Sequence, residues 1–104
     1  MLRKTSSVAT LKTAVQRFLA KKKLNYDVSY YTKDEWEDRG ESVGNGASLT
    51  IVGEGALYMT FNLLGNWIEC TKTIDEFGIV LERHGYWYEL GHHWSIHLYT
   101  LESL

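Results

Sequence analysis

Three of the four histidines in this 104-residue chain lie in residues 85–101, together with two of the four tryptophans. His93 and His97 are four residues apart, which is the spacing of the zinc ligands in a metal-binding HExxH helix. The residues around them instead alternate between two sets, Trp94, Ile96 and Leu98 against Ser95, His97 and Tyr99. This period of two is typical of a strand. Four strand residues span about 13 Å at ~3.3 Å each, too far for two imidazoles to share one zinc ion. We therefore expect no metal site.

Other patterns that could support catalysis or ligand binding fail in similar ways. Cys70, the single cysteine, is expected on the same strand face as Phe61, which predicts a buried thiol rather than a nucleophile. The acidic run 34–41 has Trp36 and Arg39 where a calcium loop needs an oxygen ligand and a glycine. The chain has no G-x-S-x-G elbow and no glycine-rich phosphate loop. We expect neither a catalytic residue nor a cofactor.

The histidine-rich stretch is predicted to form a β-hairpin. Gly91-His92 suits a two-residue type II′ turn. This turn would pair Trp87 with Ile96 on the core face and Tyr86 with His97 on the other face. The outer face would then carry four residues: Tyr86, Tyr88, His97 and Tyr99. Exposed aromatic side chains of this kind are enriched in protein interfaces, so we expect this face to be an interaction surface.

Two amphipathic helices frame the rest of the chain, at about 7–22 and 73–84. The first begins at Ser6 or Ser7, and the second is assigned a Thr73–Glu76 capping box and Gly85 as its stop. Strands are expected at 25–31, 48–52, 56–64 and 67–71, in addition to the two strands of the hairpin. Residues 32–40 fit either one helical turn, capped by Thr32 and Glu35, or an acidic loop. The predicted fold is one α+β domain over 1–104, with a mainly antiparallel sheet of about five to six strands and the two helices packed on it.

Charge is divided unevenly along the chain. Residues 1–23 carry seven bases and no acid, whereas 24–104 carry four bases and 13 acids. A nucleic-acid-binding accessory protein is therefore one alternative, using the side chains of Lys12, Arg17, Lys21, Lys22 and Lys23. We do not favour it, because these cations scatter around the helix and the acidic body would repel a polyanion.

Composition is that of a folded globule, with 44% hydrophobic and 23% charged residues. No apolar run reaches the ~20 residues of a membrane span. A single cysteine and the lack of a signal-peptide pattern favour a cytoplasmic location. The leading prediction is a small soluble, non-enzymatic protein-interaction domain that binds another protein or a second copy of itself. A second alternative is a small enzyme or ligand binder with a pocket near His97.

Overall fold

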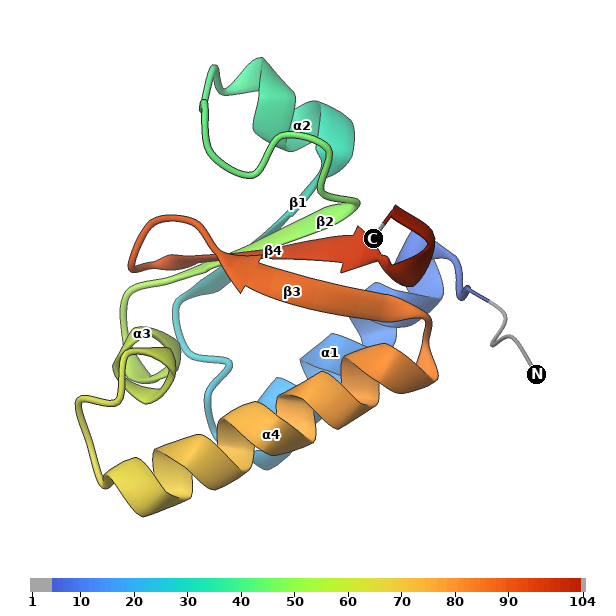
Figure 1. Ribbon diagram of the computed structural model, residues 1–104. Helices are drawn as coiled ribbons and strands as arrows, with labels where there is room; N and C mark the ends of the chain where they lie inside the picture. Colours follow the sequence, from blue (N-terminus) through green and yellow to red (C-terminus); the bar gives the residue numbers. More distant parts are fainter. Residues whose placement is uncertain (1–4, 104) are drawn as a thin grey trace.

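The computed structural model describes residues 5–103, and within them four strands form one antiparallel sheet. The strands are β1 (Val28–Thr32), β2 (Leu49–Gly53), β3 (Tyr86–Leu90) and β4 (Ser95–Thr100), in the order β1-β2-β4-β3. Helices α1 (Val8–Lys21) and α4 (Trp67–Arg83) lie below the sheet in Figure 1, and the short α2 (Lys33–Asp38) lies above it. Helix α3 (Ala56–Phe61) lies beside the start of α4, and a 3₁₀ turn (Leu101–Ser103) follows β4.

The α+β class and the antiparallel sheet are confirmed, but the predicted five to six strands and two helices are wrong. The described residues hold four strands and four α-helices. Arg3 and Lys4 of the basic segment lie outside these residues. No helix in residues 5–103 combines the length and the apolar character needed to cross a membrane.

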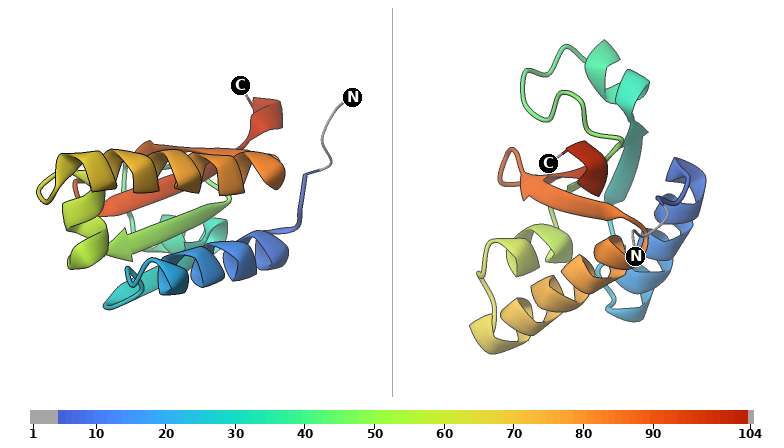
Figure 2. Two further views of the ribbon diagram at one scale, coloured as in Figure 1. Left: turned by 90° about the horizontal axis from the view of Figure 1, so that it is seen from below. Right: turned by 45° about the vertical axis from the view of Figure 1, so that its right-hand side comes forward.

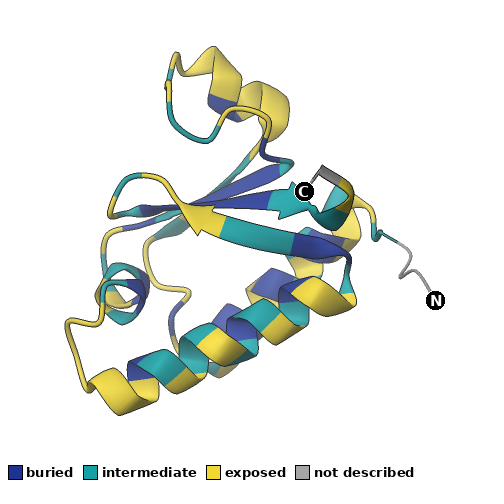
Figure 3. Ribbon diagram, viewed as in Figure 1, coloured by how far each residue is buried: buried dark blue, intermediate teal, exposed yellow. Residues whose placement is uncertain are grey.

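The core lies between the sheet and the two long helices (Figure 3). Helix α1 buries the apolar stripe that its periodicity predicts, Leu11, Val15, Phe18 and Leu19, and Ser7 caps it by accepting from the Thr10 N–H. Aromatic rings fill the centre. The ring centroid of Phe77 lies 5.8 Å from that of Phe18, 5.1 Å from that of Phe61 and 5.4 Å from that of Tyr88. Tilted and edge-on aromatic contacts at these distances add to the stabilisation from buried area.

The predicted strands at 56–64 and 67–71 are both helical. Residues 56–61 form α3, which buries Leu57 and Phe61, four residues apart, and leaves Met59 half-exposed. Leu57 and Phe61 fit both the alternation of a strand and the i, i+4 spacing of a helix, so the pattern did not distinguish the two. The second segment is the start of α4. Its N-cap is Asn66, whose Oδ1 accepts from the N–H groups of Ile68 and Glu69, both at 3.1 Å. Thr73 and Glu76 therefore lie inside the helix.

The β3–β4 hairpin forms as predicted, but in a different register. Tyr88 pairs with Leu98, Leu90 pairs with Ile96, and Gly91 to Trp94 make the connection. Ser95 closes this loop, because its N–H donates to the His92 carbonyl and its Oγ accepts the His92 N–H. Compared with the predicted two-residue turn, the register of β3 against β4 is shifted by three residues. An odd shift moves every β3 side chain to the opposite face of the sheet.

Candidate functional site

Residues 33–48 cross the face of the sheet opposite the long helices. Helix α2 begins at a complete Thr32–Glu35 capping box, so the helical alternative for this segment is confirmed. Trp36 lies beneath the segment, only 1% exposed, and its Nε1–H donates to the Val43 carbonyl at 2.7 Å. Its ring lies 5.3 Å from the His97 imidazole. Trp36 therefore anchors this segment, which we call the strap, to the sheet.

His97 is the polar centre beneath the strap. Its Nδ1 lies 2.9 Å from the Thr50 hydroxyl, and its Nε2 lies 2.9 Å from the Ser95 hydroxyl. His97 and Thr50 are each 1% exposed and Ser95 is fully buried. Every nitrogen of the ring therefore has a partner, as a buried imidazole requires.

Two glycines close the space around the imidazole. A Cβ added at Gly44 or at Gly91 would overlap the ring of His97. Gly44 also has a φ of +78°, in the left-handed region that favours glycine. The glycines that sequence reasoning assigned to turns and loops therefore also provide close packing onto a side chain.

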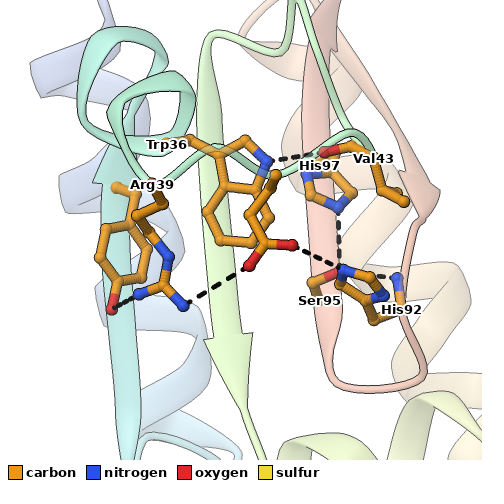
Figure 4. Close-up of polar contacts among 8 residues, drawn as sticks. Trp36, Arg39, Val43, His92, Ser95 and His97 are labelled. Atoms are coloured by element: carbon orange, nitrogen blue, oxygen red, sulfur yellow. Dashed lines mark hydrogen bonds and ion pairs between the residues drawn. The ribbon is translucent and has the colours of Figure 1, made fainter.

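A second group of contacts joins the strap to the hairpin (Figure 4). Nε2 of His92 lies 3.1 Å from a carboxylate oxygen of Glu41, and the guanidinium of Arg39 lies 3.8 Å from the other. Arg39 also donates to the Tyr31 hydroxyl and lies over the Trp36 ring. These pairs are partly exposed, so each contributes little alone, but together they tie the middle of the strap to β1 and to the hairpin loop.

The pKa of His97 is lowered from its ordinary value of 6.5. Burial is the main cause, the nearby charge of His92 acts in the same direction, and Glu41 opposes them. The neutral imidazole is therefore the favoured form in the folded protein.

Ser95 and His97 lie at the distance of a nucleophile and its general base. Both are covered by the strap, however, so a substrate could not reach the Ser95 hydroxyl in this conformation. The three clustered histidines also separate in space: His92 contacts Glu41, and His93 contacts Asn62 on the other side of the hairpin loop. Among the described residues, no group of three histidine, cysteine or acidic side chains is placed to hold a metal ion.

The predicted interaction face does not exist as one surface. Because of the register shift, Tyr86 and Tyr88 lie on the core side, where Tyr86 is 3% exposed and donates to the Ser6 carbonyl. His97 lies on the opposite side under the strap. Tyr99 is on that side as well, half-buried, with its ring stacked 5.0 Å from that of Trp87. Whether any of them contacts a partner stays a prediction.

A different apolar surface is open to solvent at the junction of α3 and α4. We call it the apolar corner, and it consists of five side chains: Met59, Leu63, Leu64, Trp67 and Ile68. Trp67 is 64% exposed and Ile68 66%. Sequence reasoning missed it because it assigned these residues to the two strands expected at 56–64 and 67–71. The only available signal was the density of apolar residues around Gly65-Asn66.

The backbone of the corner is held in place by two asparagines. Asn62 donates through its side chain to the carbonyls of Tyr58 and His93, at 2.8 and 2.7 Å, which ties α3 to the hairpin loop. Asn66 caps α4. Between them, Leu63 has a φ of +58°, a conformation that costs a residue with a Cβ about 1–2 kcal/mol. The corner is therefore a fixed and locally strained surface.

The cations proposed for nucleic-acid binding point in several directions. Lys12 lies over the Tyr30 ring, and Lys22 pairs with Glu76 at 2.8 Å while lying over Phe18. Lys21, Lys23 and Arg17 are exposed. Two of the five cations therefore already have partners within the fold.

No family model matches the chain, and no curated protein or solved structure is significantly similar to it.

Proposed function

We propose that this protein is a non-enzymatic protein-interaction domain that binds its partner through the apolar corner. The observation that supports it is the exposure of the consecutive segment 63–69, which includes Leu63, Leu64, Trp67 and Ile68. Isolated exposed apolar side chains are common, but a contiguous group marks a contact surface. Tryptophan is also the residue most enriched among the side chains that dominate binding energy.

The rigidity of the corner supports the same function. The asparagine contacts and the Asn66 cap fix the backbone before any partner binds. A preformed surface loses less conformational entropy on association than a mobile loop. Leu63 adds to this order, because its left-handed backbone ends α3 with the Leu64 N–H donating to the Met59 carbonyl and its own N–H donating to the Thr60 carbonyl.

The matching partner is another protein with an apolar recess. Trp67 and Ile68 would provide the central contacts, and the exposed Glu69 would lie at the polar rim. Loss of the exposed indole should remove most of the affinity, since truncation of such a residue commonly costs 2 kcal/mol or more.

The test uses a photo-crosslinking amino acid at position 68 in the cells that make the protein. We expect one dominant adduct from position 68 that disappears when Trp67→Glu is also present. Ile79 is the matched control, because it is exposed on the same helix about 16 Å away at ~1.5 Å per residue. Equal adducts from positions 68 and 79, or adducts that survive Trp67→Glu, would contradict the proposal.

A further inference from the structure

The sheet has two open edges on opposite sides of the molecule. In the part of the chain that the structure describes, β3 pairs only with β4, and β1 pairs only with β2. Helix α4 lies along β3 and helix α1 lies on the side of β1 (Figure 2). An unpaired edge offers a row of backbone donors and acceptors to another strand.

The polarity of the strands allows one copy to continue the sheet of another. All neighbouring strands are antiparallel, so β1 and β4 run one way, and β2 and β3 run the other way. β3 of one copy is therefore antiparallel to β1 of a second copy placed in the same orientation. The helices of both copies would then lie on the same side of the joined sheet.

The β3 edge is acidic. A groove with a volume of about 300 Å³ runs between it and α4, and its lining includes Glu82 and Gly78. Burial is the main reason that the pKa values of Tyr88 and Tyr86 are raised. The nearby charge of Asp75 raises the pKa of Tyr88 further, and that of Glu102 raises the pKa of Tyr86 further. Glu89 is exposed on the strand itself. No lysine or arginine is among the residues that line this groove.

The groove beside β1 carries cations. A groove of about 510 Å³ runs between it and α1, and its lining includes Arg17 and Tyr30 but no acidic residue. The Nζ of Lys12 lies 5.6 Å from the centre of the Tyr30 ring. The guanidinium of Arg39 lies 4.8 Å from the ring of Tyr31, the next residue of the strand.

Charge selects between the possible edge pairings. Pairing β3 with β3, or β1 with β1, would bring like charges together, whereas pairing β3 with β1 would bring opposite charges together. Gly78 leaves open space in the β3 groove, since a Cβ there would meet no atom within 4 Å. A side chain from an incoming strand could occupy this space.

We propose that copies of this chain associate head to tail, with β3 of one copy pairing antiparallel with β1 of the next. The contact is heterologous, so it can repeat and build an open chain whose length grows with concentration. It does not use the apolar corner.

The test is sedimentation velocity over a wide concentration range at low ionic strength. We expect the mean mass to rise with concentration and to fall as salt screens the charges. A charge-reversed β1 edge (Lys12→Glu with Arg17→Glu) or a charge-reversed β3 edge (Glu82→Lys with Glu89→Lys) should each weaken association about tenfold.

Mixing the two reversed variants provides the decisive observation. One has acidic groups at both edges and the other has basic groups at both edges, so association should return only in the mixture. Asp38→Lys with Glu54→Lys, on exposed residues that line neither groove, is matched in charge change to the β3 variant and should associate like the wild type.

Two results would overturn the proposal. One is a constant monomer mass at every concentration in low salt. The other is association that persists unchanged in both reversed variants. The Trp67→Glu variant should still form head-to-tail chains. This experiment therefore tests self-association independently of partner binding at the apolar corner.

Discussion

His97 is the residue on which the strap side of the molecule depends. Its two nitrogens bond the buried hydroxyls of Ser95 and Thr50, and the ring packs against Trp36. Replacing it by alanine would leave the Thr50 hydroxyl without this partner, leave the Ser95 hydroxyl only its contact with the His92 N–H, and open a cavity. Each unsatisfied buried group costs about 1–3 kcal/mol.

We therefore expect His97→Ala to lower the free energy of unfolding by about 3 kcal/mol in urea denaturation. His93→Ala is the control, because His93 is exposed and should change stability by less than about 0.5 kcal/mol. Equal effects of the two substitutions would mean that the network contributes nothing to stability.

The lowered pKa of His97 makes stability depend on pH. The unfolded chain binds the proton more tightly than the folded one, so the stabilising contribution is complete above pH 6.5. It is lost as the pH falls from 6.5 through the lower folded-state pKa. Urea denaturation between pH 7.5 and 5 should show this loss in the wild type, by at most about 1.4 kcal/mol per pH unit. His97→Gln should have a smaller slope, and equal slopes in the two proteins would contradict the assignment.

Alanine substitutions at Gly44 and Gly46 distinguish the cost of a steric clash from the cost of backbone strain. Both have positive φ values, +78° and +88°, but only a Cβ at Gly44 meets the His97 ring. Gly46→Ala should cost about 1–2 kcal/mol from the left-handed backbone alone. Gly44→Ala should cost about 1–3 kcal/mol more, from overpacking. Thermal denaturation of the two variants measures the difference, and identical melting temperatures would rule out the steric part.

At the scale of the elements, the start of α4 is the clearest departure from the sequence prediction. Asn66 caps the helix, and Thr73 lies two turns inside it. Asn66→Ala should therefore destabilise the protein by about 1 kcal/mol, whereas Thr73→Ala should lie within about 0.5 kcal/mol of the wild type. Chemical denaturation compares them. A larger loss from Thr73→Ala would place the helix start where the capping-box pattern put it.

The hairpin shows why a local pattern leaves register open. Both the two-residue turn and the observed loop preserve the alternation in β4, so Ile96 and Leu98 face the core in either case. Residues far away in the sequence decide which β3 side chains face the core. Tyr88 packs edge-on against Phe61 and Phe77, and Tyr86 reaches the Ser6 carbonyl. Neither contact is visible in residues 85–101 alone.

At the scale of the whole molecule, protection from hydrogen exchange should follow the layers. Strands β2 and β4 are paired on both sides and lie between the helices and the strap, so their amides should exchange most slowly. The amides of residues 41–47, the loop part of the strap, should exchange faster than those of β2 and β4, because few of them have a backbone hydrogen-bond partner. Mass spectrometry of peptic fragments tests this order, and slower exchange in 41–47 than in β4 would reverse it.

The amino-acid sequence alone determined α1, β2, the end of α4 at Gly85 and the α+β class. Each of these follows from contacts within a few residues: the apolar stripe of α1, its serine cap and the left-handed glycine. Only the tertiary structure decided that 56–61 and 67–72 are helical and that the strap covers His97. It also decided that the apolar corner is exposed. These outcomes rest on contacts between segments far apart in the chain, such as Trp36 with His97 and Asn62 with His93. The sequence pattern fits more than one local structure in these segments, and packing against the aromatic core selects one of them.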